Sequence, residues 1–278
     1  MKNLKGKVAV ITGAASGIGR GLALRLADEG ARLALSDVQA DGLAETARMA
    51  RERGAQEVHT ELLDVANKEA FFTYADKVAK HFGAVHLVIN NAGVALGATV
   101  REMEMKDIEW LMGINFWGVV YGTKAFLPHL ERSGEGHIVN VSSVFGIIGV
   151  PTQSAYNASK FAVRGFTEAL RQELEIEGSK VSCTCVHPGG IKTNIARNAR
   201  MSPNGALGRD KQSSADQFDK VAQTTPDEAA RVILDGVKRN KRRVLIGKDA
   251  YVIDSVQRSF PTLYQKALAI ASKFGAKA

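Results

Sequence analysis

A tyrosine and a lysine four residues apart have the types and spacing needed to transfer a proton. They occur in the run Ser154-Ala-Tyr156-Asn-Ala-Ser-Lys160. The apolar period of 154–177 indicates a helix, which would project Tyr156 and Lys160 from one face, one turn apart. A free tyrosine titrates near ~10, and an adjacent ammonium favours the phenolate and lowers that pKa. The pair could serve as an acid and base. In isolation, the same pattern also fits a packed aromatic and a solvated charge.

Two further polar side chains could join this pair. The run 137–143 indicates a strand that ends in two serines, and Ser143 lies thirteen residues before Tyr156. A hydroxyl at the carboxyl end of a strand could donate a hydrogen bond to a substrate oxygen. Asn115 lies among apolar residues in the helical pattern of 104–130. A buried amide must find partners, so Asn115 is either a core residue or a site residue.

The first thirty residues have the pattern of a strand, a glycine-rich turn and a helix. Residues 7–11 indicate a buried strand, Gly13-Ala-Ala-Ser-Gly17-Ile-Gly19 follows, and a helical pattern continues to Gly30. Such a turn lets the backbone approach a pyrophosphate closely, with the helix N-terminus facing its negative charge. The spacing differs from the common G-x-G-x-x-G fingerprint, so the turn alone does not establish a dinucleotide site.

An acidic residue follows the second predicted strand. Asp37 ends the apolar run 32–36, 18 residues after the last loop glycine. A carboxylate here can accept hydrogen bonds from an adenosine ribose and would repel a 2′-phosphate. The neighbouring Val38, Gln39 and Ala15 supply no cation for that phosphate. The pattern favours NAD over NADP, with a cap for the next helix as the alternative role of Asp37.

Strands and helices alternate along the chain, which predicts an α/β fold: a single-domain, Rossmann-like, doubly wound parallel sheet of about seven strands, with helices on both faces. Ligands bind beyond the carboxyl ends of such strands. Polar residues follow two of these strands, at Asp64-Val65 and in the run Asn90-Asn91-Ala92-Gly93, whose amides could hold a loop and line an adenine pocket. We expect a catalytic and dinucleotide-binding domain at 1–247 and an amphipathic helical extension at 248–278.

The composition is that of an ordinary globular chain. The 278 residues are 45% hydrophobic, carry a net charge of +8, and contain no run of 18 or more apolar residues and no apolar signal segment, so we expect a cytoplasmic protein. Cys183 and Cys185 are expected to be free buried thiols, and the six histidines show no ligand spacing, so no metal is predicted. Basic residues cluster only at 238–243, which argues against nucleic acid as a partner.

Taken together, the motifs resemble the short-chain dehydrogenase/reductase family over roughly residues 5–250. Their order and spacing match in Thr12-Gly-x-x-x-Gly17-x-Gly19, Asp64, Asn90-Asn-Ala-Gly93, Asn115, Ser143, Tyr156-x-x-x-Lys160 and Pro188-Gly189. Several motifs agreeing in order are far more specific than any one alone.

This resemblance implies hydride transfer between a nicotinamide cofactor and an apolar secondary alcohol or ketone. Tyr156 would be the general acid in reduction and the base in oxidation, while Lys160 would lower its pKa and bind the nicotinamide ribose. Ser143 would hold the substrate oxygen, and Asn115 would fix a water that links Lys160 to solvent. The implied cofactor-binding residues are Gly13, Ser16, Gly17, Ile18, Gly19, Asp37, Asp64, Val65, Asn91, Ala92, Gly93, Tyr156, Lys160, Pro188, Gly189, Ile191 and Thr193.

Two other functions remain open. A reductase of 3-oxoacyl thioesters would use the same chemistry, with a basic surface to receive an acidic carrier protein or coenzyme A. A catalytically silent dinucleotide sensor would use the same fold.

Three further expectations concern the lid, the tail and assembly. The polar segment 194–224, which includes Leu207, indicates a mobile substrate lid. The tail is expected to form two helices broken at Pro261 that pack on this or a partner subunit, with peripheral membrane contact less favoured. The predicted helices at 107–130 and 154–177 carry apolar residues on more than one face, which indicates at least a homodimer. The family resemblance implies a homotetramer as the alternative, and the dimer is slightly preferred.

Overall fold

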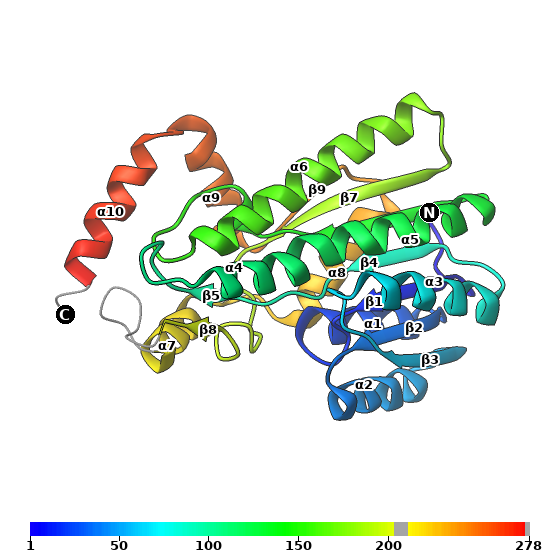
Figure 1. The fold of residues 1–278 in the computed structure, drawn as a ribbon. Coiled ribbons are helices and arrows are strands. Elements are labelled where there is room, and N and C mark those ends of the chain that lie inside the picture. The colour runs from blue at the N-terminus through cyan, green and yellow to red at the C-terminus, as the bar shows by residue number, and fades with distance from the viewer. Residues whose placement is uncertain (203–210, 276–278) are drawn as a thin grey trace.

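A seven-stranded sheet of parallel strands forms the centre of the computed structural model, which describes residues 1–202 and 211–275 (Figure 1). The strand order is β3-β2-β1-β4-β6-β7-β9. The strands up to β3 therefore lie on one side of β1, and those from β4 onward lie on the other side. The strands are β1 Val8–Thr12, β2 Arg32–Asp37, β3 Glu57–Leu62, β4 Leu87–Asn90, β6 Gly136–Val141, β7 Val181–Pro188 and β9 Arg243–Ile246. The predicted doubly wound α/β fold is confirmed.

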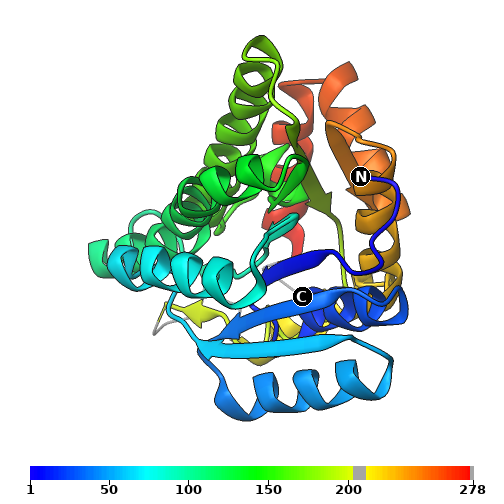
Figure 2. The ribbon, with the colours of Figure 1, turned by 90° about the vertical axis from the view of Figure 1, so that its right-hand side faces the viewer.

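Helices cover both faces of this sheet, as Figure 2 shows from the side. On one face lie α1 Gly17–Asp28, α2 Ala40–Glu52 and α8 Pro226–Lys238; on the other lie α3 Lys68–Phe82, α5 Gly118–Arg132 and α6 Ser154–Ile176. All five residues of β1 are buried, with Ala9 and Ile11 in one apolar core and Val8 and Val10 in the other. A central parallel strand buried on both faces accounts for the continuous apolar run in the sequence.

The segment 104–130 does not form one continuous helix. It consists of α4 Met105–Met112, a π-helical turn η1 Gly113–Trp117, and α5. Asn115 lies in the π-helical turn and is fully buried. Such turns are rare and often occur at functional sites.

The predicted lid contains short elements. Strand β8 Arg200–Met201 pairs with β5 Leu96–Gly97, and helix α7 Lys211–Val221 follows. Leu207 lies outside the described residues.

The tail forms the two expected helices on either side of Pro261, α9 Lys248–Ser259 and α10 Leu263–Gly275. In Figure 1, α10 stands away from the body of the molecule. The hydroxyl of Tyr264 in α10 accepts a hydrogen bond from Gly149 N in the body, at 3.1 Å. Within the described residues, no helix is both long and apolar enough to cross a membrane. Exposed apolar side chains of the tail are Tyr251, Val252, Val256, Phe260, Leu263 and Ile270.

Candidate active site

The glycine-rich turn forms a cradle between β1 and α1. Gly13 and Gly17 have φ of +66° and +54°, a region that favours glycine. A side chain at Gly19 would collide with the carbonyl oxygen of Gly13. The first turn of α1 contains no acidic residue, so its backbone N–H groups are available to an anion. These features fit a pyrophosphate.

The loops after β1 and β4 are tied together by reciprocal hydrogen bonds. Thr12 Oγ1 accepts from the backbone N–H groups of Asn91 and Ala92, each at 3.1 Å. The side-chain amide of Asn91 donates to the carbonyl oxygens of Thr12 at 2.9 Å and Gly13 at 3.2 Å. Asn91 therefore holds the glycine loop, as its amide suggested, whereas the partner role of Thr12 was not anticipated. The feature of the sequence that could have indicated this role is a hydroxyl-bearing residue at the end of a buried strand.

Asp37 joins the end of β2 to the same loop. Its Oδ2 accepts from Ala15 N at 2.9 Å, and its Oδ1 accepts from Gln39 N at 3.0 Å. The residue that caps α2 is Gln39, so the carboxylate of Asp37 mainly braces the glycine loop and the turn after β2. A partly exposed carboxylate in this place fits a ribose with free hydroxyl groups.

A cation that sequence reasoning overlooked lies beside this loop. Arg20 donates from Nη2 to the carbonyl oxygens of Ala15 at 2.6 Å and Gly42 at 3.3 Å, and from Nε to Thr46 Oγ1 at 2.9 Å. Its guanidinium is thus engaged in holding the loop against α2. The feature of the sequence that could have indicated this role is the position of Arg20 in the first turn of α1.

Asp64 and Val65 follow β3 by a short distance, since the strand ends at Leu62. Asp64 is exposed and accepts from Ala66 N at 2.9 Å. Val65 is buried against Gly118 at the start of α5. Both lie at the carboxyl end of the sheet, where the cradle is.

The four residues of the proposed catalytic set are all buried at this end of the sheet. Ser143 follows β6, while Tyr156 and Lys160 lie in the first two turns of α6. Exposed fractions are 9% for Ser143 and Tyr156, 3% for Lys160 and 0% for Asn115. Ser143 Oγ accepts from Phe145 N at 3.1 Å, and the ring of Phe145 packs edge-on against Tyr156 with centroids 6.0 Å apart.

Burial shifts the pKa values of Tyr156 and Lys160 toward their neutral forms. Burial raises the pKa of Tyr156 to about 12, although the nearby hydroxyl of Ser143 lowers it in part. Burial lowers the pKa of Lys160 to about 8. The expectation that Lys160 lowers the pKa of Tyr156 is not met in this structure. The ammonium donates to Val141 O at 3.0 Å and lies 5.7 Å from the centre of the tyrosine ring, so desolvation dominates.

Asn115 uses its whole amide to hold the loop after β4. Its Oδ1 accepts from Val94 N at 2.8 Å, and its Nδ2 donates to Val94 O at 2.9 Å and to Ser159 Oγ at 3.2 Å. The same loop passes over the site at Gly93, where a β-carbon would lie 3.3 Å from Asn115 Oδ1 and 3.4 Å from Lys160 Nζ. The π-helical turn thereby brings Asn115 next to Lys160. The implied water between them stays a prediction.

The segment after β7 reaches the glycine cradle. Pro188 ends β7, Ile191 pairs with Thr224, and the methyl group of Thr193 lies 3.1 Å from where a β-carbon of Gly17 would be. The sheet topology therefore gathers the loop after β7, the glycine cradle and the proposed catalytic set on one edge of the sheet.

The family model for short chain dehydrogenase matches residues 7–204. The chain belongs to the short-chain dehydrogenase family. It is 55% identical over 270 residues to "Putative oxidoreductase SadH" of Mycobacterium tuberculosis, covering 97% of this chain and 96% of the relative. It is 32% identical over 280 residues to human estradiol 17-beta-dehydrogenase 11, covering 99% and 87%.

A solved relative has the same fold. The crystal structure of a short-chain dehydrogenase/reductase from Burkholderia phymatum in complex with NAD superimposes with a TM-score of 0.85 at 33% identity, covering 95% of this chain and 97% of that one.

Two residues of this dehydrogenase that the sequence reasoning missed hold the catalytic helix. Asn157 donates from Nδ2 to the carbonyl oxygens of Phe145 and Ile148, both at 2.8 Å. Ser142 donates to the carbonyl oxygen of Lys160 at 2.8 Å. They fix the loop after β6 against α6 and so set the distance between Ser143 and Tyr156. The sequence indicated them only as polar residues at positions that the helical period and the strand pattern place in the interior.

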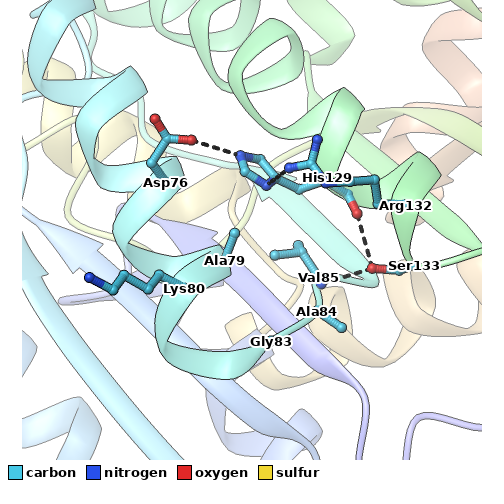
Figure 3. A pocket seen from close by; sticks show the side chains of 9 residues that line it. All are labelled: Asp76, Ala79, Lys80, Gly83, Ala84, Val85, His129, Arg132 and Ser133. Carbon is cyan, nitrogen blue, oxygen red and sulfur yellow. Dashed lines mark hydrogen bonds and ion pairs between the residues drawn. The ribbon is translucent and has the colours of Figure 1, made fainter.

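A surface hollow of about 390 Å³ lies elsewhere on the dehydrogenase (Figure 3). Its lining includes Lys80 near the end of α3, and His129 and Arg132 near the end of α5. Val85 also lines it and precedes β4, which places the hollow at the amino end of the sheet. Ligands of parallel sheets bind at the opposite end, so this hollow is not the active site.

Proposed function

We propose that this chain is an NAD-dependent oxidoreductase that interconverts an apolar secondary alcohol and its ketone. The observation that carries the proposal is the burial of both Ser143 and Tyr156 at the carboxyl edge of the sheet, with Lys160 one turn away from Tyr156. The nicotinamide would supply or accept the hydride at the carbon. The protein's own contribution is to bind the substrate oxygen and to move its proton.

In the reduction direction, Ser143 and Tyr156 would donate hydrogen bonds to the carbonyl oxygen, and Tyr156 would transfer its proton to the developing alkoxide. A pKa of about 12 keeps the phenol protonated at neutral pH, which suits a proton donor. In the oxidation direction, the same phenol must first lose its proton. The free protein therefore holds Tyr156 in the protonation state that reduction requires.

The surroundings of Tyr156 support an apolar substrate. Tyr156 belongs to a small apolar cluster with Leu96, Leu111 and Ala155, and Phe145 and Trp110 pack against it. A related protein named estradiol 17-beta-dehydrogenase fits the same substrate class, because estradiol is an apolar alcohol. We propose that the segment 194–224 covers this side of the site as a lid. A panel of ketones and 3-oxoacyl thioesters, each with NADH, separates this proposal from the thioester reductase.

The cofactor that we propose is NAD, because Asp37 would repel a 2′-phosphate and the guanidinium of Arg20 is engaged with Ala15, Gly42 and Thr46. Comparing kcat/KM for NAD and NADP with the wild-type protein tests this point. A preference for NADP would contradict the role given to Asp37.

The central test is Tyr156→Phe, which deletes only the transferable proton and the hydroxyl. We expect turnover to fall by about 10²–10⁴-fold while NAD affinity stays nearly unchanged, because proton transfer by a placed side chain contributes about that much. The control is Tyr251→Phe, which removes the hydroxyl of an exposed tyrosine. A Tyr156→Phe protein with more than about a tenth of wild-type turnover would refute the assignment.

A further inference from the structure

The C-terminal tail contacts the cofactor edge through one carboxylate. Asp249 lies in the first turn of α9, and its Oδ2 accepts a hydrogen bond from Gly190 N at 2.7 Å. The carboxylate fills a notch between two glycines, because a side chain at either Gly189 or Gly247 would collide with it. Gly247 also has a φ of +92°, which favours glycine. The backbone on both sides is thus shaped to receive this carboxylate.

Gly190 is a fixed point of the loop after β7. Its N–H group donates to Asp249, while its carbonyl oxygen accepts from Thr224 N at 3.3 Å. Two residues further on, Lys192 N donates to Thr224 O at 2.9 Å. The next residue, Thr193, meets the glycine cradle at Gly17. A change in the position of Gly190 would therefore shift the contact between this loop and the cradle.

Asp249 is itself held in place. A carboxylate in the first turn of a helix is stabilised by the helix dipole. One further turn along α9, Asp254 forms an ion pair with Arg243 of β9 at 2.6 Å, and the side-chain exposures are only 14% and 20%. These bonds join α9 to the last strand of the sheet, so the carboxylate of Asp249 is presented to Gly190 from a fixed support.

We propose that Asp249 is a positioning residue for the dinucleotide site. It holds the segment 189–193 against the glycine cradle, so the chain beyond residue 247, expected from the sequence to be a separate extension, completes the cofactor edge. The family match ends at residue 204, so the family model does not include this carboxylate. The inference rests on the proposed function in one respect, that the ligand at the cradle is a nicotinamide dinucleotide.

Three substitutions test this role. Asp249→Ala removes the acceptor, Asp249→Asn keeps an acceptor oxygen without the charge, and Lys248→Ala changes the exposed neighbour as a matched control. NAD affinity is measured by calorimetry, and backbone amide exchange is followed in peptides that cover 187–193. We expect Asp249→Ala to weaken NAD by about tenfold or more and to speed exchange of these amides, because hydrogen bonds to charged groups are the strong ones.

If the alanine variant does not fold, the asparagine variant still tests the role of the carboxylate, because it keeps the shape of the side chain. We expect Asp249→Asn to weaken NAD by about threefold, since a neutral acceptor forms a weaker bond, and Lys248→Ala to match the wild type in both measurements. NAD affinity equal to that of the wild type in the folded Asp249 variants would overturn the proposal, and so would a wild-type chain that does not bind NAD. Because neither measurement requires turnover, failure of Tyr156 as the acid would leave the result on Asp249 distinct.

Discussion

Tyr156 and Lys160 lie one turn apart in a region from which water is largely excluded. Desolvation disfavours the phenolate of the first and the ammonium of the second. At neutral pH the phenol keeps its proton, while Lys160, with a pKa of about 8, is close to its own titration. Of these two residues, Lys160 is therefore the one whose charge changes near physiological pH.

This burial predicts a dependence of stability on pH. The pKa of Lys160 falls from 10.5 to about 8 on folding, which corresponds to about 3 kcal/mol. Below pH 8 both states carry the proton, and the folded state bears the full cost of the buried charge. As pH rises from about 8 to 10.5, the folded state binds fewer protons than the unfolded state, so stability increases.

The comparison that isolates this effect is the wild type against Lys160→Met, by urea unfolding at several pH values from 7 to 10. We expect the free energy of unfolding of the wild type to rise relative to that of the variant across this range, because only the wild type has the buried lysine. The other titrating groups contribute to both proteins and cancel in the comparison. A difference between the two proteins that does not change with pH would show that Lys160 is not desolvated as described.

The helices and strands could largely be predicted from periodicity, whereas the break within 104–130 could not. A buried parallel strand and an amphipathic helix each impose a repeat on the sequence, so β1 and α6 were found close to their observed bounds. A single π-helical turn changes the repeat too little to be seen. Within this turn Asn115 bonds to both backbone groups of Val94, a contact between distant segments that local periodicity does not reveal.

The same limit applied to Lys160. Its place beside Tyr156 followed from helical spacing, but the balance between desolvation and ion pairing depends on packing. The partner that the ammonium has here, Val141 O, belongs to a strand nineteen residues earlier in the chain. Asp249 was missed for a related reason, since nothing in the local sequence of α9 indicates that its carboxylate meets the loop after β7.

The packing of α5 on the sheet yields a prediction about stability. Gly122 faces β4, where a β-carbon would collide with Asn90 Oδ1 and would lie 2.8 Å from a ring carbon of Phe71. We expect Gly122→Ala to lower the free energy of unfolding by about 1–3 kcal/mol, as other overpacked cores do. The control is Gly165→Ala on α6, where nothing lies within 4 Å of the added carbon and alanine should stabilise the helix by up to about 1 kcal/mol. Equal effects of the two substitutions in urea unfolding would contradict this close contact.

For the whole molecule, burial decides which apolar residues of α4, η1, α5 and α6 could take part in assembly. Leu111, Val119, Val163 and Leu170 are buried within the subunit and cannot form an interface. Two aromatic side chains are left exposed on elements that pack together, Trp117 of η1 at 47% and Phe161 of α6 at 42%. Large exposed aromatics are typical of interface centres.

We expect the full chain to be a dimer through this face. Trp117→Lys combined with Phe161→Glu should give monomers, because an interface centre does not accommodate unpaired charges, whereas truncation after Ser259 should leave the dimer intact while keeping Asp249. The measurement is the mass in solution by light scattering. A tetrameric full chain that falls to dimers on truncation would show instead that α10 forms a second interface.

The order of the strands also determines at which edge the sheet is extended during synthesis. After β1, β2 and β3 have been made, each later strand, β4, β6, β7 and β9 in turn, adds to the same open edge of the sheet. Chains fold from their N-terminal part during synthesis. Asp249 lies in α9, beyond the last of these strands, so it is made after the whole sheet. A nascent chain would thus have its phosphate cradle early, but would fasten the loop after β7 only once α9 has been made.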